Sequence, residues 1–162
     1  MKSVYRRNDQ CSIVITSTSL TDDHIEGLKQ GDTFGVFDGN GDILSLRTGS
    51  QGLYHGGTRF LSRFELAING ERPLLLSSTV KADTVVLSVD LLNPPLILEG
   101  QGEISGGVLH LSRTRFLWQG HCFDRSRVHN YSLYPIPVRP FFSVEAYFAD
   151  LFEFLCQNRT RW

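Results

Sequence analysis

Apolar and polar side chains alternate with a period of two through much of the chain. The alternation is clearest in residues 58–70, 84–92, 108–112 and 142–148. The apolar members of these four series are Phe60, Phe64, Leu66 and Ile68; Val85, Leu87, Val89 and Leu91; Leu109 and Leu111; and Phe142, Val144, Ala146 and Phe148. Successive side chains of a strand point to opposite faces, so this pattern predicts half-buried strands with the apolar series directed inward.

Turn signals separate these segments. They are Asp38-Gly39-Asn40-Gly41, Asn69-Gly70, Gly100 to Gly102 and Gly106-Gly107. Asn-Gly and Gly-Gly pairs supply the positive φ angles that tight hairpins need. A helical turn is predicted only at residues 20–30, opened by Thr21 or Asp22 and closed by Gly31. Elsewhere a helical period does not persist, so the chain is predicted to be all-β, either a sandwich or an open barrel of short antiparallel strands.

Length and charge narrow the class of protein. The chain has 162 residues, enough for one domain, which we place at residues 11–162 after a polar arm at 1–10. Sixteen basic and seventeen acidic residues give a net charge of −1, which argues against nucleic acid or an anionic membrane as the partner. The most apolar stretch, Leu91–Leu98, contains Pro94 and Pro95 and is too short to cross a bilayer. With no secretory signal visible, we expect a cytoplasmic protein.

The cysteines support the same expectation. Cys11, Cys122 and Cys156 form no CxxC pair and are odd in number. In a reducing compartment they are best interpreted as buried apolar residues or free thiols, with a single disulfide left open as the alternative.

The polar motifs give little support for catalysis or metal binding. Residues 38–42 have oxygen ligands at alternate positions, but Gly49 stands where a calcium loop needs its closing Glu, so a hairpin turn is the better interpretation. No spacing selects a catalytic pair among the carboxylates Asp22, Asp23, Glu26, Asp150 and Glu153. The histidines form no HxH or HExxH motif. We expect no catalytic residue, no metal and no cofactor.

Aromatic side chains are the one suggestive feature, since flat rings can stack on sugars. The candidates are Tyr5, Tyr54, Phe60, Phe116, Trp118, Phe123, Tyr131, Tyr134 and Tyr147. Core packing explains most of them more simply. Tyr54 and Trp118 are favoured as carbohydrate contacts because polar or glycine-rich turn segments flank both.

Several longer strings occur together in a familiar order. They are Gly31-Asp32-Thr33-Phe34, Gly41-Asp42-Ile43, GLYHGGTRFLSRFELAINGERPLLLSS (52–78), Arg115-Phe116-Leu117-Trp118, Asn130-Tyr131-Ser132 and FADLFEF (148–154). Over roughly residues 31–154 the chain therefore resembles the N-terminal domain of bacterial and archaeal amylo-α-1,6-glucosidases, the glycogen-debranching family.

This resemblance implies an antiparallel, supersandwich-like β-sandwich that precedes an (α/α)6 toroid. In such proteins the toroid carries the catalytic carboxylates that cleave α-1,6-linked glucose, and no position of this chain can receive them. We therefore expect an incomplete sandwich, a fragment that is not an enzyme by itself. Its expected role is to support a catalytic (α/α)6 domain or subunit and to contact α-glucan.

Two strings depart from the family pattern. Gly56-Gly57-Thr58-Arg59 stands where the resemblance implies Arg-Asp-Thr-Arg, and Leu155-Cys156 stands where it implies Arg-Gly after a valine. Together with the aromatic argument, this leaves Tyr54, Arg59 and Trp118 as expected contacts with carbohydrate or with the adjoining domain. Two alternatives stay open: a free-standing α-glucan-binding module, and an interaction protein that self-associates through an unpaired sheet edge.

Overall fold

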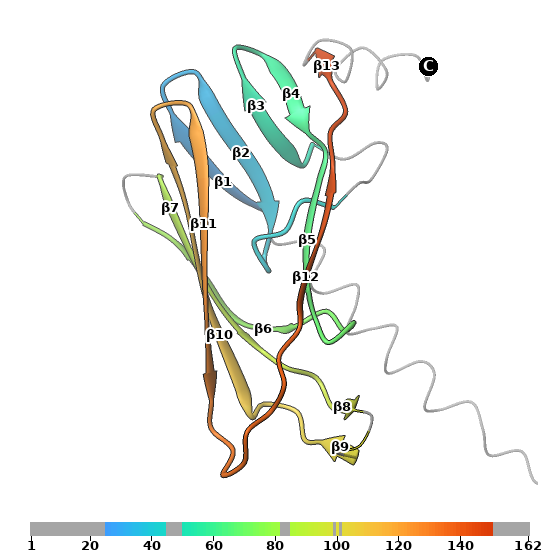
Figure 1. Cartoon of the computed structure of the whole chain (residues 1–162). Helices are drawn as coiled ribbons and strands as arrows, with labels where there is room; N and C mark the ends of the chain where they lie inside the picture. The colour runs from blue at the N-terminus through green and yellow to red at the C-terminus, as the bar shows by residue number, and fades with distance from the viewer. Residues whose placement is uncertain (1–24, 45–49, 82–84, 99, 101, 151–162) are drawn as a thin grey trace, which may run out of the picture.

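The computed structural model describes residues 25–44, 50–81, 85–98, 100 and 102–150, and these residues contain strands and no helix (Figure 1). The longer strands of the first half are β1 (Ile25–Gln30), β2 (Thr33–Asp38), β5 (Arg63–Ile68), β6 (Leu74–Val80) and β7 (Val86–Leu92). Those of the second half are β10 (Leu109–Trp118), β11 (His121–Asn130) and β12 (Pro140–Glu145). The shorter strands are β3 (Gly52–His55), β4 (Thr58–Leu61), β8 (Leu96–Leu98), β9 (Gly102–Ile104) and β13 (Ala149–Asp150).

The strands form two main sheets. The first has the order β1-β2-β3-β4-β13, and the pair β5-β12 prolongs it, since β5 follows β4 after Ser62 alone and β12 leads into β13 (Figure 1). The second has the order β11-β10-β7-β6, and β8 and β9 form a small separate hairpin. Adjacent strands are antiparallel throughout, and β1 contacts β6, β7 and β10 across the two layers. The predicted all-β sandwich is confirmed.

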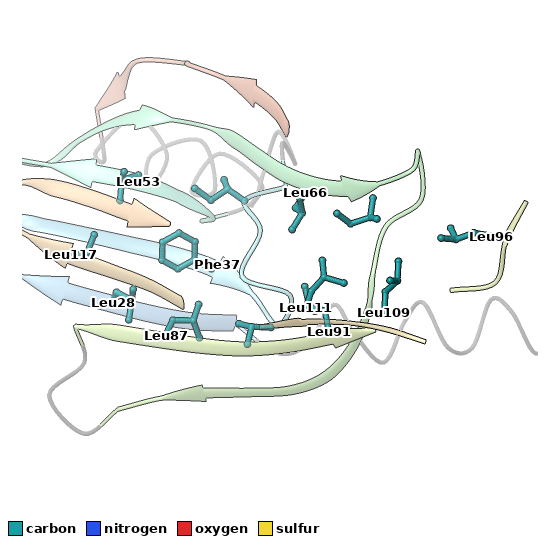
Figure 2. Packing of buried hydrophobic residues seen from close by; sticks show 13 residues of the cluster. Leu28, Phe37, Leu53, Leu66, Leu87, Leu91, Leu96, Leu109, Leu111 and Leu117 are labelled. Carbon is teal, nitrogen blue, oxygen red and sulfur yellow. The ribbon is translucent and has the colours of Figure 1, made fainter. Parts of the chain in front are cut away.

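The core lies between the sheets, where the predicted inward positions are found (Figure 2). Leu87, Val89 and Leu91 of β7 are buried, and so are Leu109 and Leu111 on the same face of the neighbouring strand β10, where Leu111 is opposite Leu91. From the first sheet come Leu28, Phe37, Leu53, Leu66 and Ile68. Burying these aliphatic and aromatic groups is the main favourable term for the fold, at roughly 25 cal/mol per Å² of apolar surface.

Two predictions about secondary structure and burial were wrong. The helical turn expected near residues 20–30 is strand β1 from Ile25 onward, and residues 20–24 lie outside the described part. Pairing of Leu28 with Gly35 on β2, and burial of the Leu28 side chain, outweigh the local capping signals. The alternating series on β12 is a strand, but Phe142 and Val144 are exposed instead of buried.

The predicted turns lie where the glycines allow them. Gly41 N–H donates to the Asp38 carbonyl at 2.9 Å, which confirms the turn interpretation of residues 38–42. Asn69-Gly70, a predicted turn, has positive φ at both residues, the geometry of a two-residue hairpin loop. Gly56-Gly57 and Gln119-Gly120, which the sequence indicated only as turn segments flanking Tyr54 and Trp118, have the same geometry.

Other expectations concern residues outside the described ranges. The residues concerned are the polar arm at 1–10, Cys11 and Cys156, and most of FADLFEF. Cys122 is described, and it is a half-buried free thiol. Within the described ranges no helix is long and apolar enough to span a membrane.

Candidate functional site

Two arginines occupy the inner face of β10. Residues 109, 111, 113, 115 and 117 all point into the sandwich, and Arg113 and Arg115 are as buried as the leucines around them (1% and 3% exposed). A buried guanidinium must be paired and hydrogen-bonded to be tolerated. The acids that pair with them, Asp42 and Asp124, come from two separate parts of the chain.

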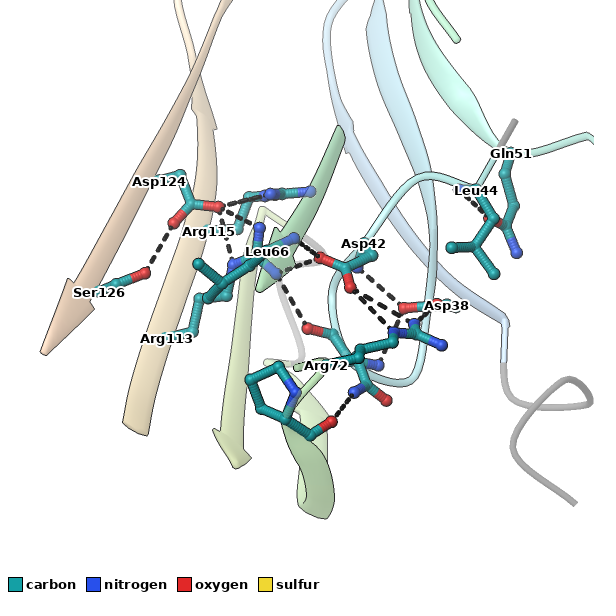
Figure 3. A network of polar contacts seen from close by, with 12 residues as sticks. Asp38, Asp42, Leu44, Gln51, Leu66, Arg72, Arg113, Arg115, Asp124 and Ser126 are labelled. Atoms are coloured by element: carbon teal, nitrogen blue, oxygen red, sulfur yellow. Dashed lines mark hydrogen bonds and ion pairs between the residues drawn. The ribbon is translucent and has the colours of Figure 1, made fainter. Parts of the chain in front are cut away.

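Arg113 connects the two sheets (Figure 3). Its Nη1 donates to Asp42 Oδ1 at 2.6 Å and to the Asn40 carbonyl at 3.1 Å, and its Nε donates to Asp124 Oδ2 at 2.9 Å. Asp124 lies on β11 directly opposite Arg115 and also accepts from the Nε of Arg115 at 3.0 Å. One carboxylate of β11 therefore holds both arginines of β10.

The acids of the β2 turn form the other end of this network. Asp38 Oδ1 accepts the backbone N–H groups of Asn40 and Asp42 at 2.9 and 2.8 Å, which fixes the turn. Arg72 donates to the second oxygen of Asp38 and, at 3.3 Å, to Asp42. Asp42 Oδ1 also accepts the backbone N–H of Leu66 at 3.2 Å.

The pKa values follow from this arrangement. Burial raises the pKa of Asp38 above its ordinary value, and the attraction of Arg72 only partly offsets the effect. Burial alone would also raise the pKa of Asp124, but Arg115 and Arg113 outweigh it, so that pKa is lowered. Burial lowers the pKa of Arg115.

Three acids and three arginines thus balance in charge. We call this set the ion network; its members are Asp38, Asp42, Asp124, Arg72, Arg113 and Arg115. The Arg115 guanidinium carbon also lies 4.6 Å from the ring centroid of Phe37 and 4.7 Å from that of Phe64. Carboxylates committed to guanidinium groups inside a core are poor general acids or bases. The ion network is therefore suited to holding the sandwich together.

The three predicted site residues lie in two places. Tyr54 is buried, stacks on Phe34 with ring centroids 4.4 Å apart, and donates its hydroxyl to the Ser50 carbonyl at 2.8 Å. Arg59 pairs with Tyr54 across β3 and β4, and its guanidinium lies 5.6 Å from the Tyr147 ring. Burial raises the pKa of Tyr54, and Arg59 opposes this effect.

Trp118 is on a different strand, at the end of the β10–β11 hairpin, with 57% of its surface exposed. It is opposite His121, and Phe116 is opposite Phe123 on the same face. Phe116 and Phe123 stack with centroids 4.8 Å apart and planes 14° apart. We name Phe116, Trp118, His121 and Phe123 the hairpin aromatic cluster. Of the three predicted residues, only Trp118 presents a ring to solvent.

A second exposed apolar region follows β11. Of the fifteen large exposed hydrophobic residues in the described part of the chain, eight lie between residues 131 and 148. They are Tyr131, Leu133, Tyr134, Phe141, Phe142, Val144, Tyr147 and Phe148, and we name them the apolar strip. The sequence analysis identified the alternation on β12 but did not predict that its apolar side chains are exposed. The high density of aromatic residues in 131–148 was the signal available for that prediction.

The remaining candidates for chemistry do not come together. Glu26 accepts a hydrogen bond from Ser78 at 3.1 Å, the side chain of Asp150 is not described, and the other predicted carboxylates lie outside the described ranges. Within those ranges no group of three His, Cys, Asp or Glu side chains is arranged to hold a metal ion. An open pocket of about 490 Å³ lies between β9 and residues 132–136, and Glu103 is the charged residue among its described lining residues.

The fold and the site define an all-β sandwich domain with a neutralised ionic core and two exposed apolar surfaces. Residues 28–160 match the family described as the N-terminal domain of (some) glycogen debranching enzymes, and the chain belongs to that family. The resemblance inferred from the sequence is thereby confirmed. Comparison with curated proteins gave no match, and comparison with solved structures gave none either.

Proposed function

We propose that this chain is a non-catalytic domain that supports the catalytic (α/α)6 domain of a glycogen-debranching enzyme, and that the apolar strip is the surface that packs against it. The observation that carries the proposal is the concentration of exposed aromatic and aliphatic side chains in residues 131–148 of a member of this family. Large exposed apolar areas on a soluble domain usually mark an interface.

The register of β12 adds support. Phe142 and Val144 lie opposite Leu66 and Phe64, so they share the face of β5 that forms the core. Phe142 also contacts Phe64, with ring centroids 5.5 Å apart. These core-facing residues are nevertheless exposed on β12, which has no second neighbouring strand among the described residues. A partner that packs here would extend a core that already exists.

The experiment is a docking assay. A debranching-enzyme catalytic domain, produced without its own N-terminal domain, is mixed with this chain, and the complex is measured by size-exclusion chromatography and calorimetry. Val144→Asp places a charge in the apolar strip on the core-facing side of β12, at a residue with 57% exposure. Leu76→Asp is the matched control, since Leu76 has 58% exposure but lies on β6, at the other edge of the second sheet from β11.

We expect the wild type and Leu76→Asp to form the complex and Val144→Asp to lose it, because burying an unpaired charge is costly. Equal docking by both variants, or no docking by the wild type, would refute the proposal. Formation of dimers by the chain alone, abolished by Val144→Asp, would instead favour self-association through this surface.

A further inference from the structure

The outer face of the β10–β11 hairpin carries aromatic, hydroxyl and arginine side chains. Even-numbered residues of β10 and odd-numbered residues of β11 share this face, because their partners in the register are directly opposite. Its end is the hairpin aromatic cluster, where Phe123 and Trp118 are exposed beside His121. The Gln119-Gly120 loop closes this end, and a Cβ at Gly120 would lie 3.8 Å from His55.

Polar groups continue along the same face. Thr114 lies opposite Arg125 and Ser112 opposite Arg127, directly beyond the stacked rings. Both arginines are exposed. Hydroxyl and guanidinium groups beside an aromatic surface provide donors and acceptors around an apolar platform.

His121 adds an oriented acceptor. Its Nδ1 lies 2.9 Å from the Gln119 carbonyl oxygen, which can only accept, so Nδ1 must carry the proton of that hydrogen bond. In the neutral ring Nε2 is then the acceptor. The His121 and Phe123 ring centroids are 6.1 Å apart, so this acceptor lies beside the platform.

We propose that the hairpin aromatic cluster binds an α-linked glucan chain, with a glucose ring stacked on Trp118 and Phe123 and its hydroxyls bonded to His121 and Arg125. The rings offer apolar area with a polar rim, which matches the apolar C–H face and equatorial hydroxyls of glucose. A chain with net charge −1 has no general attraction for polyanions, so a neutral polymer fits this face better than a nucleic acid. The choice of α-glucan rests on the proposed function.

The test uses the full chain in native gels cast with glycogen, followed by calorimetry with maltoheptaose. We expect the wild type to be retarded, and Trp118→Ala and Phe123→Ala each to weaken binding by about ten-fold or more. Trp118→Phe keeps a ring and should retain most of the affinity. The control is Phe141→Asp, which replaces an exposed aromatic residue on β12 and should bind glycogen as the wild type does.

The outcomes separate the two proposals. Wild-type binding that Trp118→Ala leaves unchanged, or no binding at all, refutes the glucan site whatever the docking assay gives. Equal affinity for cellohexaose refutes the α-glucan assignment. Tight, salt-sensitive binding of a single-stranded oligonucleotide in place of glycogen would also refute it, because aromatic rings with arginines suit that ligand too. Loss of docking with glycogen binding intact refutes only the supporting role.

Discussion

Replacing Arg113 by methionine tests whether the ion network stabilises the sandwich. Methionine preserves part of the contact with Phe64, whose ring centroid lies 5.5 Å from the Arg113 guanidinium, but removes the hydrogen bonds to Asp42 and Asp124. Asp42 would keep only the Leu66 N–H and the more distant Arg72 as partners. An uncompensated buried charge of this kind costs about 3–5 kcal/mol.

That loss is large against the roughly 5–15 kcal/mol by which domains are stable. With a urea m value of about 2 kcal/mol/M, the unfolding midpoint should fall by about 2 M. Arg113→Lys keeps the charge but not the planar guanidinium group that reaches both acids. Its unfolding midpoint should therefore lie between those of the wild type and Arg113→Met. The matched control is Arg125→Met on exposed β11, which should change stability by less than about 0.5 kcal/mol. A midpoint of Arg113→Met within about 0.3 M of the wild type would refute the reasoning.

Two further predictions concern the same core. Asp124→Asn should destabilise the protein at pH 7. Its difference in stability from the wild type should shrink as the pH falls below 3.8, the ordinary pKa of an aspartate side chain. The reason is that a carboxyl group whose pKa is lower in the folded than in the unfolded state stabilises the fold above the unfolded-state pKa, and this stabilisation is lost as the native carboxylate becomes protonated. Urea midpoints of both proteins from pH 2 to 7 would show this. A difference in midpoint that stays constant over this range would contradict it. Leu87→Ala should cost about 2–5 kcal/mol, since Leu87 is fully buried. A urea midpoint near that of the wild type would mean that the β7 side chains point the other way.

The sequence alone predicted the fold class and the inward face of its central strands. The alternation of Leu87, Val89 and Leu91 is strong because both neighbours of β7 lie within the sheet. The same alternation runs through β10, but it was followed only to residue 112. Continued in phase, it reaches Leu117 and would have placed Arg113 inside the sandwich.

Other features depend on tertiary contacts that sequence patterns do not encode. The strand at residues 25–30 forms because β2 and the core are available to pair with it, whereas its local signals favour a helical turn. Tyr54 has turn residues around it, yet its ring is buried against Phe34. Asp42 and Arg113 are seventy-one positions apart, and no local pattern could have joined them.

The ion network also bears on how the chain reaches its native state. Arg113 holds the turn after β2 to the hairpin β10–β11, so neither the first third nor the last third of the molecule can satisfy its buried charges separately. Contacts of such wide sequence separation are costly to close and slow folding. The sandwich should therefore open and form as a single cooperative unit, with the slowest amide exchange shared by the strands on both sides of Arg113.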